Sequence, residues 1–135
     1  MSVQTGPSQS IRQLVIERDG FQCVRCGHPV SGEPGVGYSL QHRIPRGMGG
    51  SKDPRLNRPS NLVLLCGSGT TGCHGEVESK RTDAREHGFA LWRSLDPTTM
   101  PVTVAIWPAQ GSAPAVTVNY LLDDLGGRTE VRTDG

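Results

Sequence analysis

Residues 60–74, SNLVLLCGSGTTGCH, join a short apolar run to a glycine-rich turn and two cysteines. The run LVLL at positions 62–65 is typical of a buried strand, because a strand covered on both faces carries apolar residues without alternation. The residues that follow, HGEVESKRTDAREH (74–87), favour a helix that Gly88 ends. This part of the chain therefore predicts a strand, a turn and a helix in that order.

Toward the N-terminus, residues 38–45 (YSLQHRIP) predict a second strand, and residues 47–60 predict a long loop broken by glycine and proline. Residues 11–18 (IRQLVIER) predict a helix, with Ser8 or Ser10 as its cap and Asp19-Gly20 as its stop. Residues 21–30 (FQCVRCGHPV) predict an extended–turn–extended unit. The polar residues 1–9 are expected to form a disordered tail.

Toward the C-terminus, the β-branched runs VTVAIW (102–107) and VTVNYLL (116–122), followed by GGRTEV, predict a hairpin or a small meander. The change in character places a boundary near residues 96–97. We expect residues 10–96 to form the domain that carries the function and residues 97–135 to form a β-rich extension. Two roles stay open for the extension, which can lengthen the first sheet or form a dimer interface.

The composition limits the size of the core. A chain of 135 residues with 34% hydrophobic and 4% aromatic residues, and with Gly 18 and Pro 10, predicts one loop-rich domain that needs a staple. No apolar run approaches the roughly 20 residues of a membrane span. The first ten residues do not have the pattern of a secretory signal. We therefore expect a cytosolic protein without membrane contact.

The four cysteines provide the candidate staple. Cys23-x2-Cys26 and Cys66-x6-Cys73 are two turns far apart in sequence, each of which can supply two thiolates to a tetrahedral zinc. Thiols stay reduced in the cytosol, which favours zinc over two disulfides or four free thiols. His28 is an alternative ligand that we expect at the surface instead. Four thiolates leave zinc no open position, so the ion is expected to hold the fold rather than to catalyse.

A basic loop follows the second predicted strand. The net charge of +1 does not by itself indicate a nucleic-acid binder. Residues 43–58 nevertheless contain five basic residues and only one acidic residue, Asp53. The basic residues are Arg43, Arg46, Lys52, Arg55 and Arg58. Such a loop can contact the phosphates of DNA, and the alternative is an ordinary solvated loop.

Three segments, YSLQHRIPRGMGG (38–50), SNLVLLC (60–66) and CHGEVES (73–79), together resemble the HNH endonuclease family. The resemblance covers residues 11–79 and is strongest to the zinc-bearing subgroup and to small nucleases of tailed bacteriophages. It implies an α+β fold with a ββα-metal (His-Me finger) core and hydrolysis of DNA phosphodiester bonds. In phages, similar nucleases assist DNA packaging alongside terminase or act as homing or host-degrading enzymes, which implies the host cytoplasm.

The chemistry of such an enzyme assigns a role to each residue that carries the resemblance. His42 can take a proton from water, because imidazole titrates near neutral pH. Asn61 can fix the tautomer of that ring by accepting from its other N–H. His74 at a helix start can bind a divalent metal (Mg²⁺, Mn²⁺ or Zn²⁺), and Glu78, one turn later, can add a carboxylate oxygen.

One position departs from the family, which often has Asp, a metal ligand, before its first histidine. This chain has Gln41, whose carbonyl can coordinate Mg²⁺ or Mn²⁺ but brings no charge. Taken singly, each site residue also has an ordinary structural explanation. The alternative function is therefore a non-catalytic zinc-ribbon module that binds DNA or a protein, for which His42 is dispensable.

Overall fold

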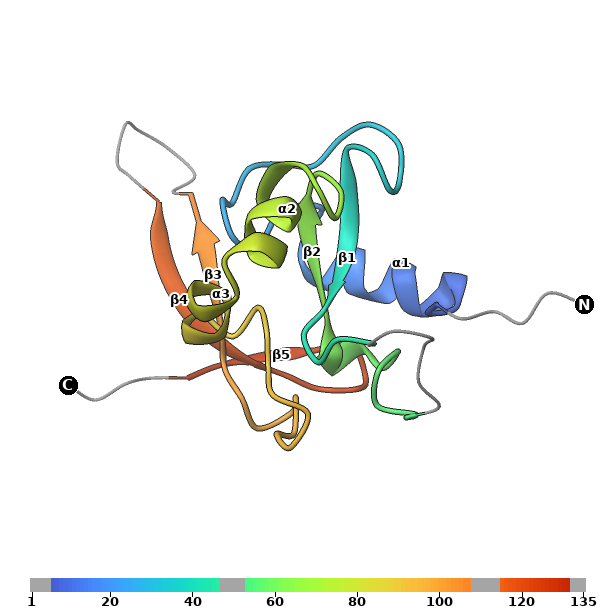
Figure 1. Ribbon diagram of the computed structural model, residues 1–135, viewed down its shortest axis with the longest axis vertical. Helices are drawn as coiled ribbons and strands as arrows, with labels where there is room; N and C mark the ends of the chain where they lie inside the picture. The colour runs from blue at the N-terminus through green and yellow to red at the C-terminus, as the bar shows by residue number, and fades with distance from the viewer. Residues whose placement is uncertain (1–5, 47–52, 108–114, 132–135) are drawn as a thin grey trace, which may run out of the picture.

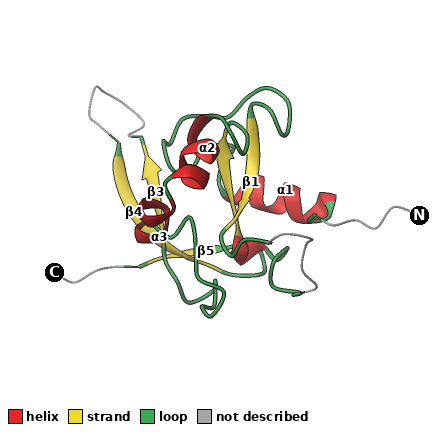
Figure 2. Ribbon diagram, in the orientation of Figure 1, coloured by secondary structure: helices red, strands yellow, loops and turns green. Residues whose placement is uncertain are grey.

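The computed structural model describes residues 6–46, 53–107 and 115–131 (Figure 1). Helices and strands alternate with long loops (Figure 2), in keeping with the many glycines and prolines. The elements of this small α+β fold follow in chain order: α1 (Gln9–Arg18), β1 (Tyr38–His42), the short 3₁₀ helix η1 (Pro59–Asn61), β2 (Leu62–Cys66), α2 (Gly72–Ser79), α3 (Arg81–Glu86), β3 (Val102–Ile106), β4 (Val116–Leu122) and β5 (Arg128–Glu130).

β1 and β2 form an antiparallel pair in the middle of the molecule, with Tyr38 opposite Cys66 and His42 opposite Leu62. The side chains at positions 62–65 of β2 are all fully buried. They are covered on both faces, because α2 lies in front of the pair and α1 behind it in Figure 1. The predicted strand at 60–66 is confirmed from Leu62 onward, since the residues before it form η1.

α1 is confirmed with its predicted cap, because the side chain of Ser8 accepts from the backbone N–H of Ile11. Its end is tied to β2 by Arg18, which donates to the carbonyl of Leu62 at 2.6 Å and forms a buried ion pair with Asp19 at 2.9 Å. The carboxylate of Asp19 also accepts from the backbone N–H of Leu64. These contacts fix α1 against the back of β2.

The single helix predicted over residues 74–87 is wrong in one respect, because the structure has two shorter helices in its place. Lys80 leaves helical geometry with φ −116° and ψ 68°, so α2 ends and α3 begins on either side of it. The intervening sequence ESKRTD has no apolar side chain. Since tertiary packing of an apolar face stabilises most helices, nothing there favours a continuous one.

The C-terminal strands form a second antiparallel sheet in the order β3-β4-β5, as the meander prediction required. This sheet does not extend the β1–β2 pair but is joined to it through one residue. The backbone N–H of Val24 donates to Leu64 of β2 at 3.0 Å, and the N–H of Ala105 in β3 donates to the carbonyl of Val24 at 2.8 Å.

The hydrophobic core is shared between the two predicted parts of the chain. Cys23, Val63 and Val77 belong to the same buried cluster as Val102 and Leu122. The boundary expected at residues 96–97 therefore does not separate two cores. No helix in the described ranges combines the length and apolar character needed to cross a membrane.

Candidate metal centre and catalytic site

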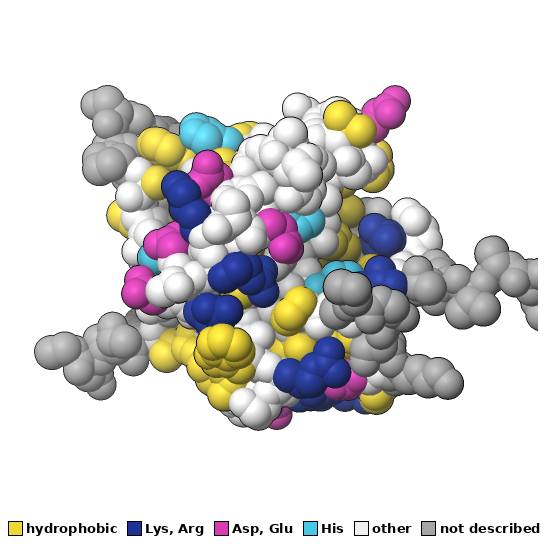
Figure 3. All heavy atoms as spheres, viewed as in Figure 1, with side chains coloured by type: hydrophobic (Ala, Val, Ile, Leu, Met, Phe, Trp, Pro, Cys, Tyr) yellow, Lys and Arg dark blue, Asp and Glu magenta, His cyan; other side chains and the backbone are white. Residues whose placement is uncertain are grey.

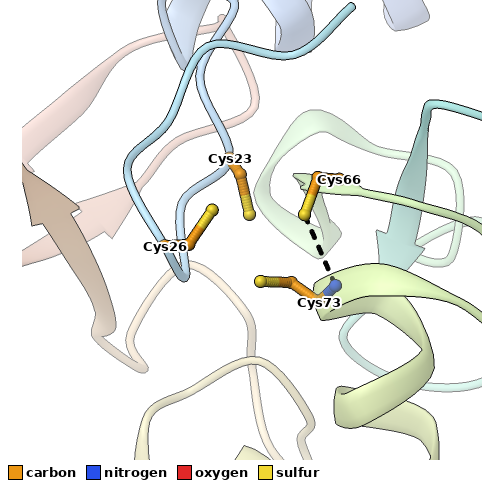
Figure 4. Close-up of side chains that lie close together, drawn as sticks. All are labelled: Cys23, Cys26, Cys66 and Cys73. Carbon is orange, nitrogen blue, oxygen red and sulfur yellow. Dashed lines mark hydrogen bonds between the residues drawn. The ribbon is translucent and has the colours of Figure 1, made fainter. Parts of the chain in front are cut away.

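The four cysteines converge on one point between the turn at residues 23–26, the end of β2 and the start of α2 (Figure 4). Their sulfur atoms all lie within 4.8 Å of one another. Four thiolates around one zinc at about 2.3 Å stand about 3.8 Å apart, so a small contraction would complete a tetrahedron. All four are free cysteines, which contradicts the alternative of two disulfides. The group can therefore hold a metal ion.

Glycines allow both cysteine turns to close. Gly27 has φ 78°, a conformation that costs glycine little, and its N–H donates to the carbonyl of Cys23 at 2.7 Å. In the second turn Gly67 has φ 85°, and a Cβ there would lie 2.2 Å from the carbonyl oxygen of Thr71. The backbone can thus fold back over the six residues that separate Cys66 from Cys73.

The electrostatics of the cluster favour a bound cation. Burial raises the pKa of Cys26, and a hydrogen bond with Cys23, together with burial, raises the pKa of Cys73. Arg25 donates to the sulfur of Cys73 at 3.4 Å and partly offsets this rise. Crowded thiols of raised pKa stay protonated until a metal ion stabilises the thiolates, so the cluster suits metal binding better than free thiolate chemistry.

β3 supports the first cysteine turn from outside, a contact that sequence reasoning missed. The indole Nε1 of Trp107 donates to the carbonyl of Cys26 at 2.9 Å, and a Cβ on Gly27 would lie 2.8 Å from the Trp107 ring. The ring of His28 packs against the same indole at a tilt of 31°, with ring centroids 5.0 Å apart. This places His28 at the surface, as expected, rather than among the sulfurs. The glycine after the second cysteine was the available signal, since it indicates close approach by another group.

His42, at the end of β1, is held by a residue that the sequence did not single out. Its Nε2 lies 2.9 Å from Oδ1 of Asn57. An amide oxygen only accepts, so Nε2 carries the proton and Nδ1 has the lone pair. Burial lowers the pKa of His42, and the positive charges of Arg46 and Arg12 lower it further. The ring is therefore neutral at pH 7, in the form that accepts a proton.

Asn61 does not hold the His42 ring, which corrects the contact expected from the sequence. Asn61 is fully buried, and its Oδ1 accepts from the backbone N–H of Ile44 at 2.8 Å. Its Nδ2 donates to the carbonyls of Ile44 and Leu56. The side chain thus ties the two ends of the loop after β1 together. It acts on the position of His42 through the backbone.

His74 and Glu78 lie together on α2, as the helical spacing required. Ser39 of β1 donates its hydroxyl proton to the carbonyl of Gly67, so its oxygen accepts from Nδ1–H of His74. This leaves the lone pair on Nε2, which lies 3.7 Å from a carboxylate oxygen of Glu78. Burial lowers the pKa of His74, which keeps the ring neutral as a metal ligand must be.

The pair does not by itself make a complete metal site. Within the described ranges, the four cysteines form the only cluster of three or more His, Cys, Asp or Glu ligand atoms. A positive charge also faces Glu78, because Nη1 of Arg81 lies 3.8 Å from its other carboxylate oxygen. His74 and Glu78 can therefore supply two ligands to a cation, and the remaining positions are left to water or substrate.

Gln41 lies on the side of β1 that α2 covers, two residues from Ser39, but it is only 1% exposed. Its Nε2 donates to the carbonyl of Phe89 at 3.4 Å. No hydrogen bond joins it to His74 or Glu78 within the described residues. Its role as a metal ligand stays a prediction.

Arg43 is not a DNA contact, which corrects the sequence expectation. Its side chain is 0% exposed, and its guanidinium donates to five backbone carbonyls, those of Ser60, Gly88, Pro97, Met100 and Pro101. Burial lowers the pKa of Arg43 to about 9, so the group is still charged at pH 7. Arg43 joins the η1 region to the chain after α3, and it does so from inside the protein.

The other basic residues of the loop divide into two groups. Arg55 pairs with Asp53 at 2.8 Å and donates to the carbonyls of Arg93 and Leu95, so it is a structural link. Arg46 and the exposed Arg58 remain available for phosphates, while Lys52 lies outside the described residues. Arg12 of α1 was missed by sequence reasoning, yet its charge reaches His42.

Comparison of the chain with protein-family models, with curated proteins and with solved structures finds no significant match.

Proposed function

We propose that this protein is a metal-dependent endonuclease that hydrolyses phosphodiester bonds of DNA. The observation that carries the proposal is the state of His42, a neutral imidazole whose Nε2 is engaged by Asn57 and whose Nδ1 has a lone pair. The chain order β1, β2, α2 supports a ββα-metal core, with His42 ending the first strand and His74 near the start of the helix.

In the proposed reaction, Nδ1 of His42 takes a proton from water as the water oxygen bonds to phosphorus. The bond from phosphorus to the 3′ oxygen breaks, and the 3′ oxygen takes up a proton from solvent. The products are a 5′-phosphate and a 3′-hydroxyl. His74 and Glu78 would hold a divalent metal, which would supply positive charge to offset the charge on the phosphate and on the departing oxygen.

The positive charges around His42 support a nucleic acid as substrate. Arg46 and Arg12 both lower the pKa of His42, so their guanidinium groups create a positive field where the phosphate is proposed to bind. We further propose zinc as the structural ion of the four cysteines. A role beside terminase in a phage-infected cell is a proposal that rests on the sequence resemblance alone.

A cleavage assay on supercoiled plasmid tests the proposal. Purified protein is incubated with Mg²⁺, Mn²⁺ or Zn²⁺, beside the variants His42→Ala and His87→Ala. His87 is the matched control, because it interacts with Asp83 on α3. His42→Ala should lower the rate at least about 100-fold, as expected for a lost general base, and His87→Ala should not. A wild type that cuts with none of these metals would contradict the proposal.

The alternative function is a non-catalytic DNA-binding module built on the cysteine cluster. The incomplete ligand set around His74 and the uncharged, buried Gln41 favour it. It predicts about one metal ion per chain, no cleavage under any condition, and equal DNA affinity for wild type and His42→Ala. The cleavage assay combined with metal analysis therefore separates the two functions.

A further inference from the structure

Trp92 is a large aromatic side chain that the fold leaves 60% exposed. The chain after α3 runs beside the end of β1, because the N–H of Leu91 donates to the carbonyl of Arg43 at 2.7 Å. Leu91 itself is buried, whereas the next residue, Trp92, points outward. Trp92 therefore directly follows the donor of this hydrogen bond, Leu91, and His42 directly precedes its acceptor, Arg43.

The position of Trp92 is fixed rather than loose. The guanidinium carbon of Arg85 lies 3.9 Å from the centroid of the indole and covers one of its faces. The backbone after Trp92 forms a turn, in which the N–H of Leu95 donates to the carbonyl of Trp92. Arg55 adds hydrogen bonds to the carbonyls of Arg93 and Leu95. An indole that keeps 60% exposure with a guanidinium on one face offers its other face to solvent.

Single exposed apolar residues are common, and Leu125 or Val36 need no functional explanation. Trp92 differs in having a cation against its ring and an exposed Arg93 as its chain neighbour. In Figure 3, apolar side chains lie directly against Lys and Arg side chains on the face that also carries His side chains. A flat ring beside positive charges is the combination with which proteins bind single-stranded nucleic acids.

We propose that Trp92 is a stacking platform for an unpaired nucleobase, with Arg85 and Arg93 beside it to receive the flanking phosphates. Every base has a flat π face, so the platform does not require a particular sequence. A base within a duplex is already stacked on its neighbours and cannot reach the indole. The proposal rests on the proposed nuclease function and deepens it, because it names the substrate class as DNA with an unpaired stretch.

Binding measurements on the full chain test the platform. The probes are an oligothymidylate of about 12 nucleotides, within the range of known single-strand sites, and an abasic strand of equal length and charge. The variants are Trp92→Ala, Trp92→Phe and, as a matched control, Phe21→Ala, which removes another exposed aromatic side chain. The chain has only two tryptophans, so fluorescence of Trp92→Phe reports Trp107 alone.

The oligothymidylate should quench the fluorescence of the wild type but not that of Trp92→Phe. Trp92→Ala should weaken oligothymidylate binding about 5- to 100-fold, the range for one lost stacking contact, and leave binding of the abasic strand unchanged. Trp92→Phe should retain most of the affinity, and Phe21→Ala all of it. An unchanged metal content in each variant serves as the check that the fold is intact.

Two outcomes would overturn the platform. In one, Trp92→Ala binds oligothymidylate as well as the wild type does; in the other, the wild type binds abasic and base-bearing strands equally. If the quench and the selective loss occur while no plasmid is ever cut, the platform stands and the nuclease proposal fails. If the plasmid is cut but neither signal appears, the nuclease stands and the platform fails.

Discussion

Nε2 of His42 and Oδ1 of Asn57 lie 2.9 Å apart, and this contact decides which nitrogen of the ring is free to accept a proton. Asn57→Ala should slow plasmid cleavage about 10- to 100-fold, because the ring can then rotate and exchange tautomers. Asn57→Asp should restore orientation and move the pH profile upward, since a carboxylate raises the pKa of His42. Rates measured across pH distinguish this from a structural loss, which would leave the profile in place.

Asn61 should matter for stability rather than for the tautomer of His42. Asn61→Ala removes the partner of three buried backbone groups on Ile44 and Leu56, so the free energy of unfolding should fall by about 3 kcal/mol. Urea denaturation measures the change. Asn57→Ala serves as the control and should change the free energy of unfolding by less than Asn61→Ala does.

Arg43→Ala should destabilise the protein by at least about 3 kcal/mol, because five backbone carbonyls lose their donor inside the fold. Arg43→Lys keeps the charge but has fewer hydrogen-bond donors, so its free energy of unfolding should lie between those of the wild type and Arg43→Ala. Neither change should remove a phosphate contact. By contrast, Arg58→Ala should flatten the salt dependence of DNA affinity by about one unit of slope while stability stays unchanged. A flatter slope in an Arg43→Ala variant that is still folded would show that Arg43 does reach DNA.

Removal of the metal should be visible in the fluorescence of Trp107. Its indole donates to the carbonyl of Cys26, so loss of the ion from the cysteines should expose the ring and shift its emission to longer wavelength. A chelator strong enough to take zinc should produce this shift together with cooperative unfolding. Cys26→Ser should start in the shifted state, and Trp92→Phe provides the background in which Trp107 is the only reporter. If the emission wavelength of Trp107 does not change when the chelator is added, the fold does not depend on metal.

The pH dependence follows from the lowered pKa of His42, which faces Arg12 on α1, Arg46 in the loop, and Glu78 and His74 on α2. A ring that protonates less readily stays a base at lower pH, so cleavage should persist below the ordinary value of 6.5 before it falls. Stability has the same sign, because the unfolded chain binds the proton first. The contribution of His42 to the free energy of unfolding should be complete above pH 6.5 and should decline as pH falls toward the lowered pKa. Denaturation of wild type and His42→Ala at several pH values measures this contribution.

Most element positions could be predicted from the sequence because apolar runs, caps and glycines act locally. The end of α1 at Asp19 and the strand at 62–66 depend on signals within a few residues. Two predictions about the site were wrong for a different reason: the contact of Asn61 with His42, and the contact of Arg43 with DNA. Asn57 and Asn61 are both asparagines of the same loop, and only the path of the loop decides which one reaches His42.

The burial of Arg43 is a second case in which residue type misled the prediction. Arginines in a loop are usually solvated, and the composition of residues 43–58 gave no reason to separate one from the rest. Arg43 shares the buried side of Gln41, two residues before it, but both residues are polar and the sequence does not mark that side as buried. The carbonyls that satisfy it come mostly from residues 88–101, which no local pattern connects to position 43.

Val24 joins the two sheets by giving its N–H to Leu64 and its carbonyl to Ala105, and this has a consequence for the order of folding. The first cysteine turn is made early in synthesis, but it gains its last backbone partner only when residue 105 has left the ribosome. Contacts of such long sequence separation are slow to form. All four cysteines precede β3 in the chain, so the support that Ala105 and Trp107 give to the first cysteine turn is added after the last cysteine has been made.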